Sequence, residues 1–267
     1  MKRRDFLKSA TALTALAGVG QISPQSASAQ LAKADKPQYY ELRIYTLKSE
    51  HQQKLVDDYW QKAAIPAYNR LGSKPIGVFT ELDAPEVNKL LVLIPFDSLE
   101  AFATANASLQ ADAEYQTAGA DYLTTAKADP AYVRFDSSLL MAFESMKKLA
   151  APASAEGNKP WIFELRTYES HSETKGFNKI EMFNNGEVPV MQEVGLSPVF
   201  FAQTLIGPRL PNLVYMVSGE DKKAHSEHWK AFFAAPTWTK LSTDPKFKDN
   251  VSKVVSAFWK RTAYSQI

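Results

Sequence analysis

Apolar and polar side chains alternate along residues 40–45, Tyr-Glu-Leu-Arg-Ile-Tyr, and the same alternation returns along residues 163–168, Phe-Glu-Leu-Arg-Thr-Tyr. Because successive side chains of a β-strand point to opposite faces, this period of two predicts a strand with one polar face in both places. Glu164 follows Glu41 by 123 residues (164 − 41). The chain is therefore predicted to contain one structural unit twice.

The spacing of 123 residues is kept well beyond these strands. It relates Pro66 to Pro189, Gly72 to Gly195 and Pro75 to Pro198, all without a gap. Later the spacing falls to 115 (244 − 129), since Asp129-Pro130 corresponds to Asp244-Pro245. The first copy is therefore predicted to carry about eight extra residues between its second helical region and its last strand, where a longer loop costs little entropy.

Hydrophobic period and capping residues predict the elements of each copy. In the first copy they predict strand 39–47, a helix that begins at Ser49 and ends at Gly72, strands 75–82 and 89–96, a helical region from Asp97 to residue 126, and strand 132–143. In the second copy they predict strand 161–168, helix 173–194, strands 198–206 and 212–218, helix 221–242 and strand 251–264. Pro66 and Pro189 lie inside the first helix of each copy and predict a kink or a break there.

Each copy thus has the order strand, helix, strand, strand, helix, strand, which is the order of a ferredoxin-like unit. The predicted fold class is α+β, with two βαββαβ halves at residues 38–147 and 160–267 and a linker over residues 148–159 that lacks strand character. The open sheet of such a unit has helices on one face only. We expect the two bare faces to pack against each other, so that one chain forms a single barrel.

The repeated polar face is the first candidate for chemistry. If Tyr40, Leu42 and Ile44 pack under the helices, the polar face must point into the barrel and meet its counterpart from the other copy. The predicted ligand-binding residues are those of both polar faces: Glu41, Arg43, Tyr45, Glu164, Arg166 and Tyr168. Arginine clamps with tyrosine donors suit a small anionic or carbonyl-bearing ligand. The alternative, which we favour, is that each arginine pairs with its own or the opposite glutamate, so that no buried charge is left alone.

His225 and His228 lie three residues apart in the second helical region of the second copy. Two imidazoles at this spacing can ligate a metal or a haem iron. However, no nearby Asp, Glu or Cys completes a ligand set of suitable spacing, and the corresponding positions of the first copy carry no ligand. No metal and no cofactor are therefore predicted. His51 and His171 lie near the starts of the first helices, where capping or exposure is expected.

Other motifs give little direction. The chain has no Gly-rich phosphate loop, no Gly-x-Ser-x-Gly and no zincin motif, so ordinary nucleotide and hydrolase chemistry is not supported. Tryptophans can line a ligand pocket but are more often core residues. This holds for Trp60, Trp161, Trp229, Trp238 and Trp259.

Composition excludes several classes of function. The net charge of the 267 residues is +2, and residues 1–29 contribute +3 of it, so the rest carries about −1 (2 − 3) and has no electrostatic footprint for nucleic acid. A single apolar stretch of 14 residues is too short to span a bilayer. The chain has no cysteine, which excludes disulfides, thiolate nucleophiles and Cys-ligated metals.

Residues 1–29 have the three parts of an export signal. These are the basic segment Lys2-Arg3-Arg4-Asp5-Phe6-Leu7-Lys8, a mildly apolar stretch over residues 9–22 and the small-residue site Ala27-Ser28-Ala29. The paired arginines resemble a bacterial twin-arginine signal. This resemblance implies export of the folded protein and cleavage after Ala29, and it predicts a periplasmic location. A mitochondrial-type or merely basic N-terminus is the alternative.

Both copies resemble the NIPSNAP family. The resemblance lies in the Glu-Leu-Arg-x-Tyr strand, the Pro and Gly at the end of the first helix, Asn88 or Asn212 before an apolar strand, and the Glu-Tyr or Thr-Trp pair in the second helical region. It covers nearly all of residues 38–267 and implies the dimeric α+β barrel fold, with the two halves as an intrachain pseudo-dimer. This chain departs from the usual pattern in its tandem copies, its export signal and Pro236-Thr237-Trp238, which lacks the acidic residue before the aromatic one.

Three kinds of function remain open. The first is an exported protein that binds a small molecule between its two sheets, with no defined reaction. The barrel group also includes cofactor-free monooxygenases and haem-dependent members, so the resemblance in fold implies an oxidoreductase as the alternative. The third is a structural or interaction protein that uses its outer helices. A small-molecule ligand is the expected partner, further self-association is open, and neither nucleic acid nor a membrane span is expected.

Overall fold

A computed structural model describes residues 36–84, 89–152 and 161–267 of the protein. The predicted export signal, with its cleavage after Ala29, and residues 153–159 of the predicted linker lie outside these residues. In the described part of the chain, no helix is long and apolar enough to cross a bilayer.

Each half has the predicted order of elements. The first half consists of β1 (Tyr39–Thr46), α2 (Glu50–Tyr59), the π-helical turn η1 (Trp60–Ala64), α3 (Ile65–Arg70), β2 (Gly77–Glu81), β3 (Lys89–Phe96), α4 (Leu99–Ala111), α5 (Ala113–Ala118), α6 (Ala120–Leu123) and β4 (Arg134–Ala142). The second half consists of β5 (Ile162–Glu169), α7 (Glu173–Met182), the π-helical turn η3 (Phe183–Glu187), α8 (Val188–Glu193), β6 (Ser197–Ile206), β7 (Asn212–Gly219), α9 (Lys222–Ala234), α10 (Pro236–Thr243), η4 (Pro245–Phe247) and β8 (Lys253–Arg261).

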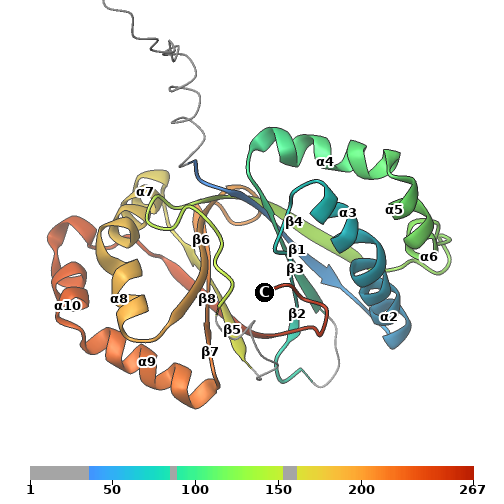
Figure 1. The fold of residues 1–267 in the computed structure, drawn as a ribbon. Coiled ribbons are helices and arrows are strands. Elements are labelled where there is room, and N and C mark those ends of the chain that lie inside the picture. Colours follow the sequence, from blue (N-terminus) through green and yellow to red (C-terminus); the bar gives the residue numbers. More distant parts are fainter. Residues whose placement is uncertain (1–35, 85–88, 153–160) are drawn as a thin grey trace, which may run out of the picture. The chain divides into compact units, whose positions relative to one another are not determined.

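The eight strands form one closed antiparallel barrel in the order β1-β3-β2-β8-β5-β7-β6-β4. Within each half the first strand lies between the third and the fourth, and the halves are joined by the pairing of β2 with β8 and of β4 with β6. Helices α2–α6 lie outside the strands of the first half, and α7–α10 lie outside those of the second (Figure 1). The predicted α+β fold class and the sheet-to-sheet packing are confirmed.

The barrel interior is apolar and takes residues from both halves. Its buried members are Tyr40, Leu42, Phe79, Leu91, Leu93, Leu140, Ala142, Phe163, Leu165, Val199, Phe200, Ala202, Val214, Met216, Trp259 and Ile267. Two further clusters lie between each sheet and its own helices, one in each half. The hydrophobic core thus has three layers. The middle layer fills the barrel between the two sheets and is shared by both halves, and each outer layer lies between one sheet and its helices.

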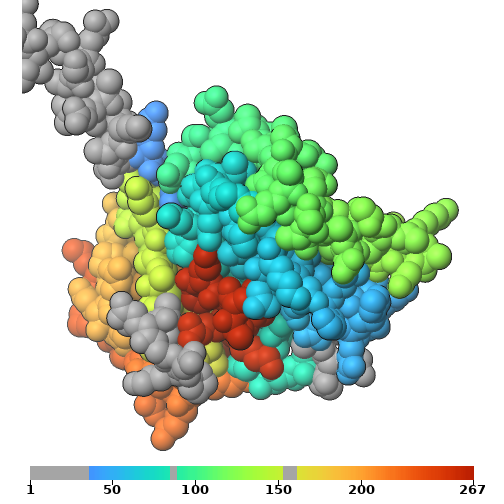
Figure 2. Space-filling model, turned by 45° about the vertical axis from the view of Figure 1, so that its right-hand side comes forward, coloured from blue at the N-terminus to red at the C-terminus, as the bar shows by residue number. Residues whose placement is uncertain are grey.

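The last residues of the chain return from β8 to the first half and lie between the two halves, where Figure 2 shows them in red. The backbone N–H of Gln266 donates to the carbonyl oxygen of Ile76 at 2.9 Å, and the Ile76 N–H donates to the side-chain oxygen of Gln266 at 2.8 Å. Ile267 is fully buried in the interior cluster. These contacts join the halves in addition to the two strand pairings.

The polar face of each first strand points the opposite way from the prediction. Tyr45 packs with Trp60 and Tyr68 beneath the helices of the first half, whereas Tyr40 and Leu42 point into the barrel. Both faces of the sheet are buried, so the alternation defines two faces without showing which one is inside. The helices supply polar partners for the buried charges of this face: Tyr68 in the first half, and His225 and Trp229 in the second.

Both prolines interrupt the first helix of their half, as predicted, and the interruption is a π-helical turn. The Ile65 N–H donates to the Trp60 carbonyl, and the Val188 N–H donates to the Phe183 carbonyl, five residues back instead of four. A proline ring clashes with the carbonyl four residues before it, so a wider turn just ahead of it relieves the clash.

The helix ends follow local chemistry. The hydroxyl of Ser49 accepts a hydrogen bond from the Gln52 N–H at 3.2 Å and caps α2, as predicted. The cap of α4 is Ser98, whose hydroxyl accepts from the Ala101 N–H, and not Asp97 as predicted. Gly72, predicted to end the first helix, has φ of 89°, a left-handed conformation that favours glycine.

Candidate functional site

The predicted site residues of the first half form a buried ion pair beneath the helices. Arg43 donates from Nε and Nη2 to the two carboxylate oxygens of Glu41, at 2.6 and 2.8 Å. Nη2 also donates to the hydroxyl of Tyr68 on α3 at 3.0 Å, and the Ser137 hydroxyl donates to Glu41 at 2.7 Å. Burial lowers the pKa of Arg43, but Tyr68 and Glu41 more than offset this and hold it above its usual range.

Glu164 is the centre of the corresponding cluster in the second half. Its Oε1 accepts from Arg166 at 2.6 Å and from Ser256 at 2.5 Å, and its Oε2 accepts from the His225 Nε2–H and the Trp229 Nε1–H, both at 2.8 Å. Burial alone would raise the pKa of Glu164, but the bond from His225, the charge of Arg166 and the Ser256 hydroxyl lower it to about 2. The structure therefore holds this carboxylate in its ionised form.

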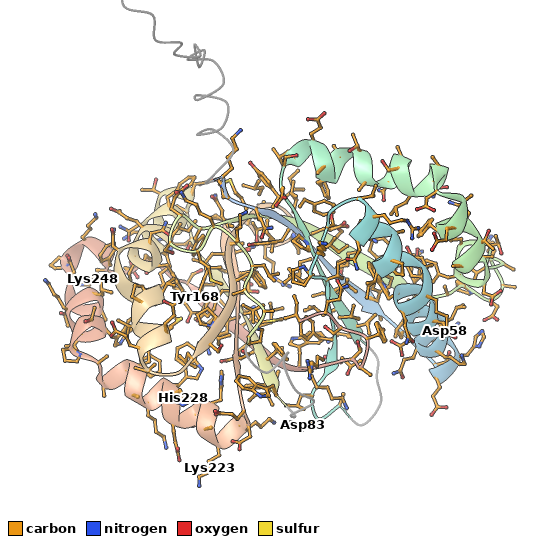
Figure 3. All side chains as sticks on the ribbon, in the orientation of Figure 1. Asp58, Asp83, Tyr168, Lys223, His228 and Lys248 are labelled. Carbon is orange, nitrogen blue, oxygen red and sulfur yellow. The ribbon has the colours of Figure 1, made fainter. Side chains whose placement is uncertain are left out.

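The two clusters lie in separate halves, so the predicted meeting of the six residues inside the barrel is wrong. Each arginine is paired with the glutamate of its own strand, which confirms the favoured alternative. The Tyr45 hydroxyl lies 3.4 Å from that of Tyr122, and the Tyr168 hydroxyl accepts from Tyr215 at 2.8 Å. Figure 3 shows Tyr168 on the helix-covered side of the second-half strands.

The histidines also have local partners. His225 contacts Glu164 and is almost fully buried, while His228, labelled on α9 in Figure 3, packs against Gly195. Within residues 36–84, 89–152 and 161–267, no group of three or more His, Cys, Asp or Glu side chains could hold a metal ion. His51 is exposed, 3.5 Å from Asp129, and His171 is exposed, so the expectation of exposure is confirmed for both.

A different site lies between the two sheets, where all eight strands line a cavity of about 420 Å³ at one mouth of the barrel. Its apolar lining residues are Leu42, Ile44, Leu165, Val214, Val255, Ala257 and Trp259, with Pro208. Its polar lining residues are Thr46, Glu81, Lys89, Asp136, Ser138, Thr167, Thr204, Arg209 and Asn212. This volume lies within the range of small-molecule sites, about 300–1,000 Å³.

Most polar groups of the cavity already have partners. Lys89 pairs with Glu81 at 3.0 Å, and at the matching place of the second half Thr204 donates to Asn212 at 2.5 Å. The amide of Asn212 in turn donates to the carbonyls of the loop before it, which fixes that side of the mouth.

Other polar side chains of the lining have no such partner in the described part of the chain: Thr46, Asp136, Ser138, Thr167 and the indole N–H of Trp259. Arg209 is not among them, since it pairs with Glu169 at 3.2 Å. The side chain of Asp136 is exposed and has neither an ion pair nor a hydrogen bond in the described part of the chain. The indole N–H of Trp259, a residue only 3% exposed, has no acceptor among the same residues. The carboxylate of Asp136 can accept a hydrogen bond from a ligand, whereas the Trp259 N–H is inaccessible from the cavity.

Of this lining, the sequence analysis offered only Trp259 as a pocket candidate, as one of five tryptophans, and it expected Leu42 and Ile44 to pack under the helices. The signal was present in the sequence. Leu42 and Leu165 point into the barrel, and four residues further along the same face of each strand Thr46 and Glu169 are polar, as is Thr167. Interior positions that become polar near a strand end indicate a mouth that water reaches. The signal could be used only if the inward face was known, and the prediction had the faces reversed.

Comparison with solved structures shows the same fold. A proposed monooxygenase from Fusobacterium nucleatum subsp. nucleatum ATCC 25586 has a TM-score of 0.55 at 10% sequence identity, covering 85% of this chain and 93% of the other. A proposed monooxygenase from Lactobacillus acidophilus NCFM has a TM-score of 0.55 at 7% identity, covering 85% and 94%. A NIPSNAP-like domain protein of uncharacterised function from Burkholderia xenovorans matches 39% of this chain and 88% of its own at 16% identity and a TM-score of 0.36.

Among curated proteins, no sequence matched the chain. The sequence profile of the NIPSNAP family matches it twice, over residues 40–145 and 163–266. The two matches span the two βαββαβ halves and together cover most of the chain. The protein therefore belongs to the NIPSNAP family and carries two copies of the family's domain in a single closed barrel.

Proposed function

We propose that the protein binds a small, largely apolar molecule in the cavity between its two sheets. The observation that carries the proposal is the cavity itself, about 420 Å³, with apolar side chains on its walls and polar ones at its rim. A concave apolar site with a few polar groups that fix orientation is the usual form of a small-molecule site. The clusters around Glu41 and Glu164 lie outside this cavity, where hydrogen bonds from Arg43 to Tyr68 and from Trp229 to Glu164 join β1 and β5 to their helices.

The charges at the rim favour an uncharged ligand over an anion. Lys89 and Arg209 are the cations of the lining, and each is paired with a glutamate. An anionic ligand would have to compete with these pairs and would also face Asp136. A carbonyl-bearing molecule needs only one hydrogen-bond donor, so this part of the expected ligand chemistry is retained.

A panel of four related bicyclic compounds tests the proposal: tetralin, 1-tetralone, 5,6,7,8-tetrahydro-2-naphthol and 6-hydroxy-1-tetralone. A ligand that binds only the native state raises the melting temperature, so at least one compound is expected to raise Tm progressively with concentration. The Ala257→Phe variant places a ring in the cavity and is expected to fold and to lose the shift. Val254→Phe, on the opposite, exposed face of β8, is the matched control and should keep it.

The proposal is overturned if none of the four compounds shifts Tm of the parent, or if Ala257→Phe responds as the parent does. The same measurement is the first step in testing the oxidoreductase alternative. A compound that raises Tm can then be incubated with the protein and analysed for an oxidised product. A structural role would leave both the parent and the variant without a response.

The proposal includes export. The paired arginines at positions 3 and 4, the apolar stretch and the small-residue site after it are the features that support it. Replacement of both arginines by lysine is expected to keep the full-length chain in the cytoplasm of a bacterial host, whereas the parent is recovered from the periplasm without residues 1–29. Equal periplasmic recovery of both proteins would contradict a twin-arginine route.

A further inference from the structure

We infer that the side chain of Asn212 closes a window in the barrel wall and so limits the length of the molecule that the barrel cavity accepts. The window is the opening inside the β6–β7 loop, residues 207–211, which lies between the barrel cavity and a second cavity outside the barrel. This inference rests on the proposed binding function. It identifies the residue that sets the size limit of that site.

The second cavity lies between the β6–β7 loop and helix α7 and has a volume of about 210 Å³. Its apolar lining includes Phe177 and Ile180 of α7 and Leu210 and Pro211 of the loop. Phe177 is 59% exposed and Leu210 is 48% exposed, so this cavity is open to solvent. We call it the outer groove. It offers apolar surface to any chain that can reach it.

The β6–β7 loop has a cavity on each of its two sides. Pro208 and Arg209 line the barrel cavity, whereas Leu210 and Pro211 line the outer groove. The two cavities are therefore separated by the loop and by the side chain that fills the space inside it.

The side chain of Asn212 fills this space. The regular pairing of β6 with β7 ends just before Thr204 and Asn212, which face each other across the opening of the loop. Thr204 Oγ1 donates to Asn212 Oδ1 at 2.5 Å, and Asn212 Nδ2 donates to the carbonyl oxygens of Pro208 and Arg209, both at 2.9 Å. The amide thus spans the loop from one arm to the far end.

Thr204 and Asn212 also line both cavities, although each residue is buried, at 6% and 7% exposed. Space on both sides of a buried side chain means that its removal joins the two cavities. Thr204 borders the opening from its own strand, while the amide of Asn212 lies across it. Asn212 is therefore the residue whose truncation opens the window.

The closed window limits the length of a ligand. A chain longer than the barrel cavity must leave through the mouth into water, where a further methylene group gains nothing from burial. Through an open window the same chain could enter the outer groove and contact Phe177, Ile180 and Leu210. Each methylene group buried there is expected to strengthen binding about fourfold, which corresponds to about 0.8 kcal/mol.

A series of straight-chain primary alcohols, from 1-butanol to 1-dodecanol, measures this limit. Calorimetry gives the dissociation constant of each alcohol for the parent and for Asn212→Ala. In the parent, affinity is expected to rise with chain length and to level off where the chain fills the barrel cavity. In Asn212→Ala it is expected to continue rising, about fourfold for each further carbon that enters the outer groove.

Asn212→Leu is the matched control. Leucine has as many side-chain heavy atoms as asparagine and a similar branched shape, so it fills the window without the hydrogen bonds to Thr204, Pro208 and Arg209. Any loosening of the loop is common to both variants, and only alanine leaves the window empty. Affinity for Asn212→Leu is therefore expected to level off at the same chain length as in the parent. Asn212→Ser opens the same window if the alanine variant does not fold.

Leu210→Asp, added to Asn212→Ala, tests whether the additional length lies in the outer groove. Leu210 lines this groove and not the barrel cavity, and its exposure allows a charged replacement. A carboxylate beside the chain makes burial of methylene groups there unfavourable. The additional gain in affinity is expected to disappear.

The inference is overturned if affinity levels off at the same chain length in the parent and in Asn212→Ala, or if Asn212→Leu behaves as Asn212→Ala does. It is also overturned if the additional gain survives Leu210→Asp, or if no alcohol binds the parent, because the cavity then takes no chain that could reach the window. The proposed function is judged separately, by the shift in Tm with the bicyclic compounds and its loss in Ala257→Phe.

Discussion

Replacement of Lys179 by methionine is expected to lower the free energy of unfolding by about 3–5 kcal/mol, the usual cost of removing one partner from a buried ion pair. Lys179 Nζ donates to both carboxylate oxygens of Glu187, at 2.9 and 2.8 Å, and both side chains are nearly inaccessible to water. Burial raises the pKa of the Glu187 carboxyl above its ordinary value, although Lys179 and the more weakly acting Arg166 lower it. Without Lys179 the desolvated carboxyl loses the cation that is hydrogen-bonded to it.

A second variant separates loss of the charge from loss of packing. Methionine retains most of the length of lysine and can contact the rings of Tyr168, Phe183 and Trp238, which surround Lys179 Nζ at 4.9–5.6 Å. The double variant Lys179→Met, Glu187→Leu removes both charges and is expected to recover most of the lost stability. The first half supports this, because the residues that match Lys179 and Glu187 are Val56 and Ala64, both buried without any ion pair.

Urea unfolding of the parent, both single variants and the double variant gives the coupling energy directly. A single variant that is as stable as the parent, or a double variant less stable than either single one, would show that the pair does not behave as a buried ion pair. The hypothetical ligand plays no part in this measurement, since neither residue lines the barrel cavity.

The fold was predictable from the sequence because the patterns that indicate it, strand alternation and helix-interrupting prolines, are local and occur in both halves. Alternation in residues 40–45 and 163–168, and prolines at matching helical positions, required no knowledge of distant contacts. The pair of Lys179 and Glu187 was not predictable in this way. Eight residues apart on an ordinary α-helix, two side chains are separated by about 12 Å along the axis and do not meet. The π-helical turn lies between them, and its presence is known only from the structure.

The site was less predictable than the fold because each sheet is covered on both sides. In a sheet with one face in water, the polar positions of β1 would mark the exposed face. Here Arg43 and Glu41 face helices that provide Tyr68, and the corresponding Glu164 faces His225 and Trp229 of α9. These partners lie 25 or more residues away in sequence. The sequence pattern therefore identified the polar face of each strand but not the helices that this face contacts. The cavity was missed for the same reason.

Glu164 is expected to make the stability of the protein depend on pH in the acid range. The pKa of this carboxyl is about 2 in the folded protein, against an ordinary value of 4.5. A folded pKa below the unfolded one means that the unfolded chain binds the proton more tightly. The stabilisation is therefore complete above pH 4.5 and is lost as the pH falls toward 2, at about 1.4 kcal/mol for each unit of pKa difference.

The Glu164→Gln variant isolates this contribution from that of the other carboxyl groups. Glutamine does not titrate, so the difference in the free energy of unfolding between parent and variant carries the pH dependence of Glu164 alone. This difference is expected to fall by about 2 kcal/mol between pH 6 and pH 3, as measured by urea unfolding at each pH. A difference that stays constant over this range would mean that Arg166, His225 and Ser256 do not hold the carboxylate ionised, and that Glu164 acts only through its shape and hydrogen bonds.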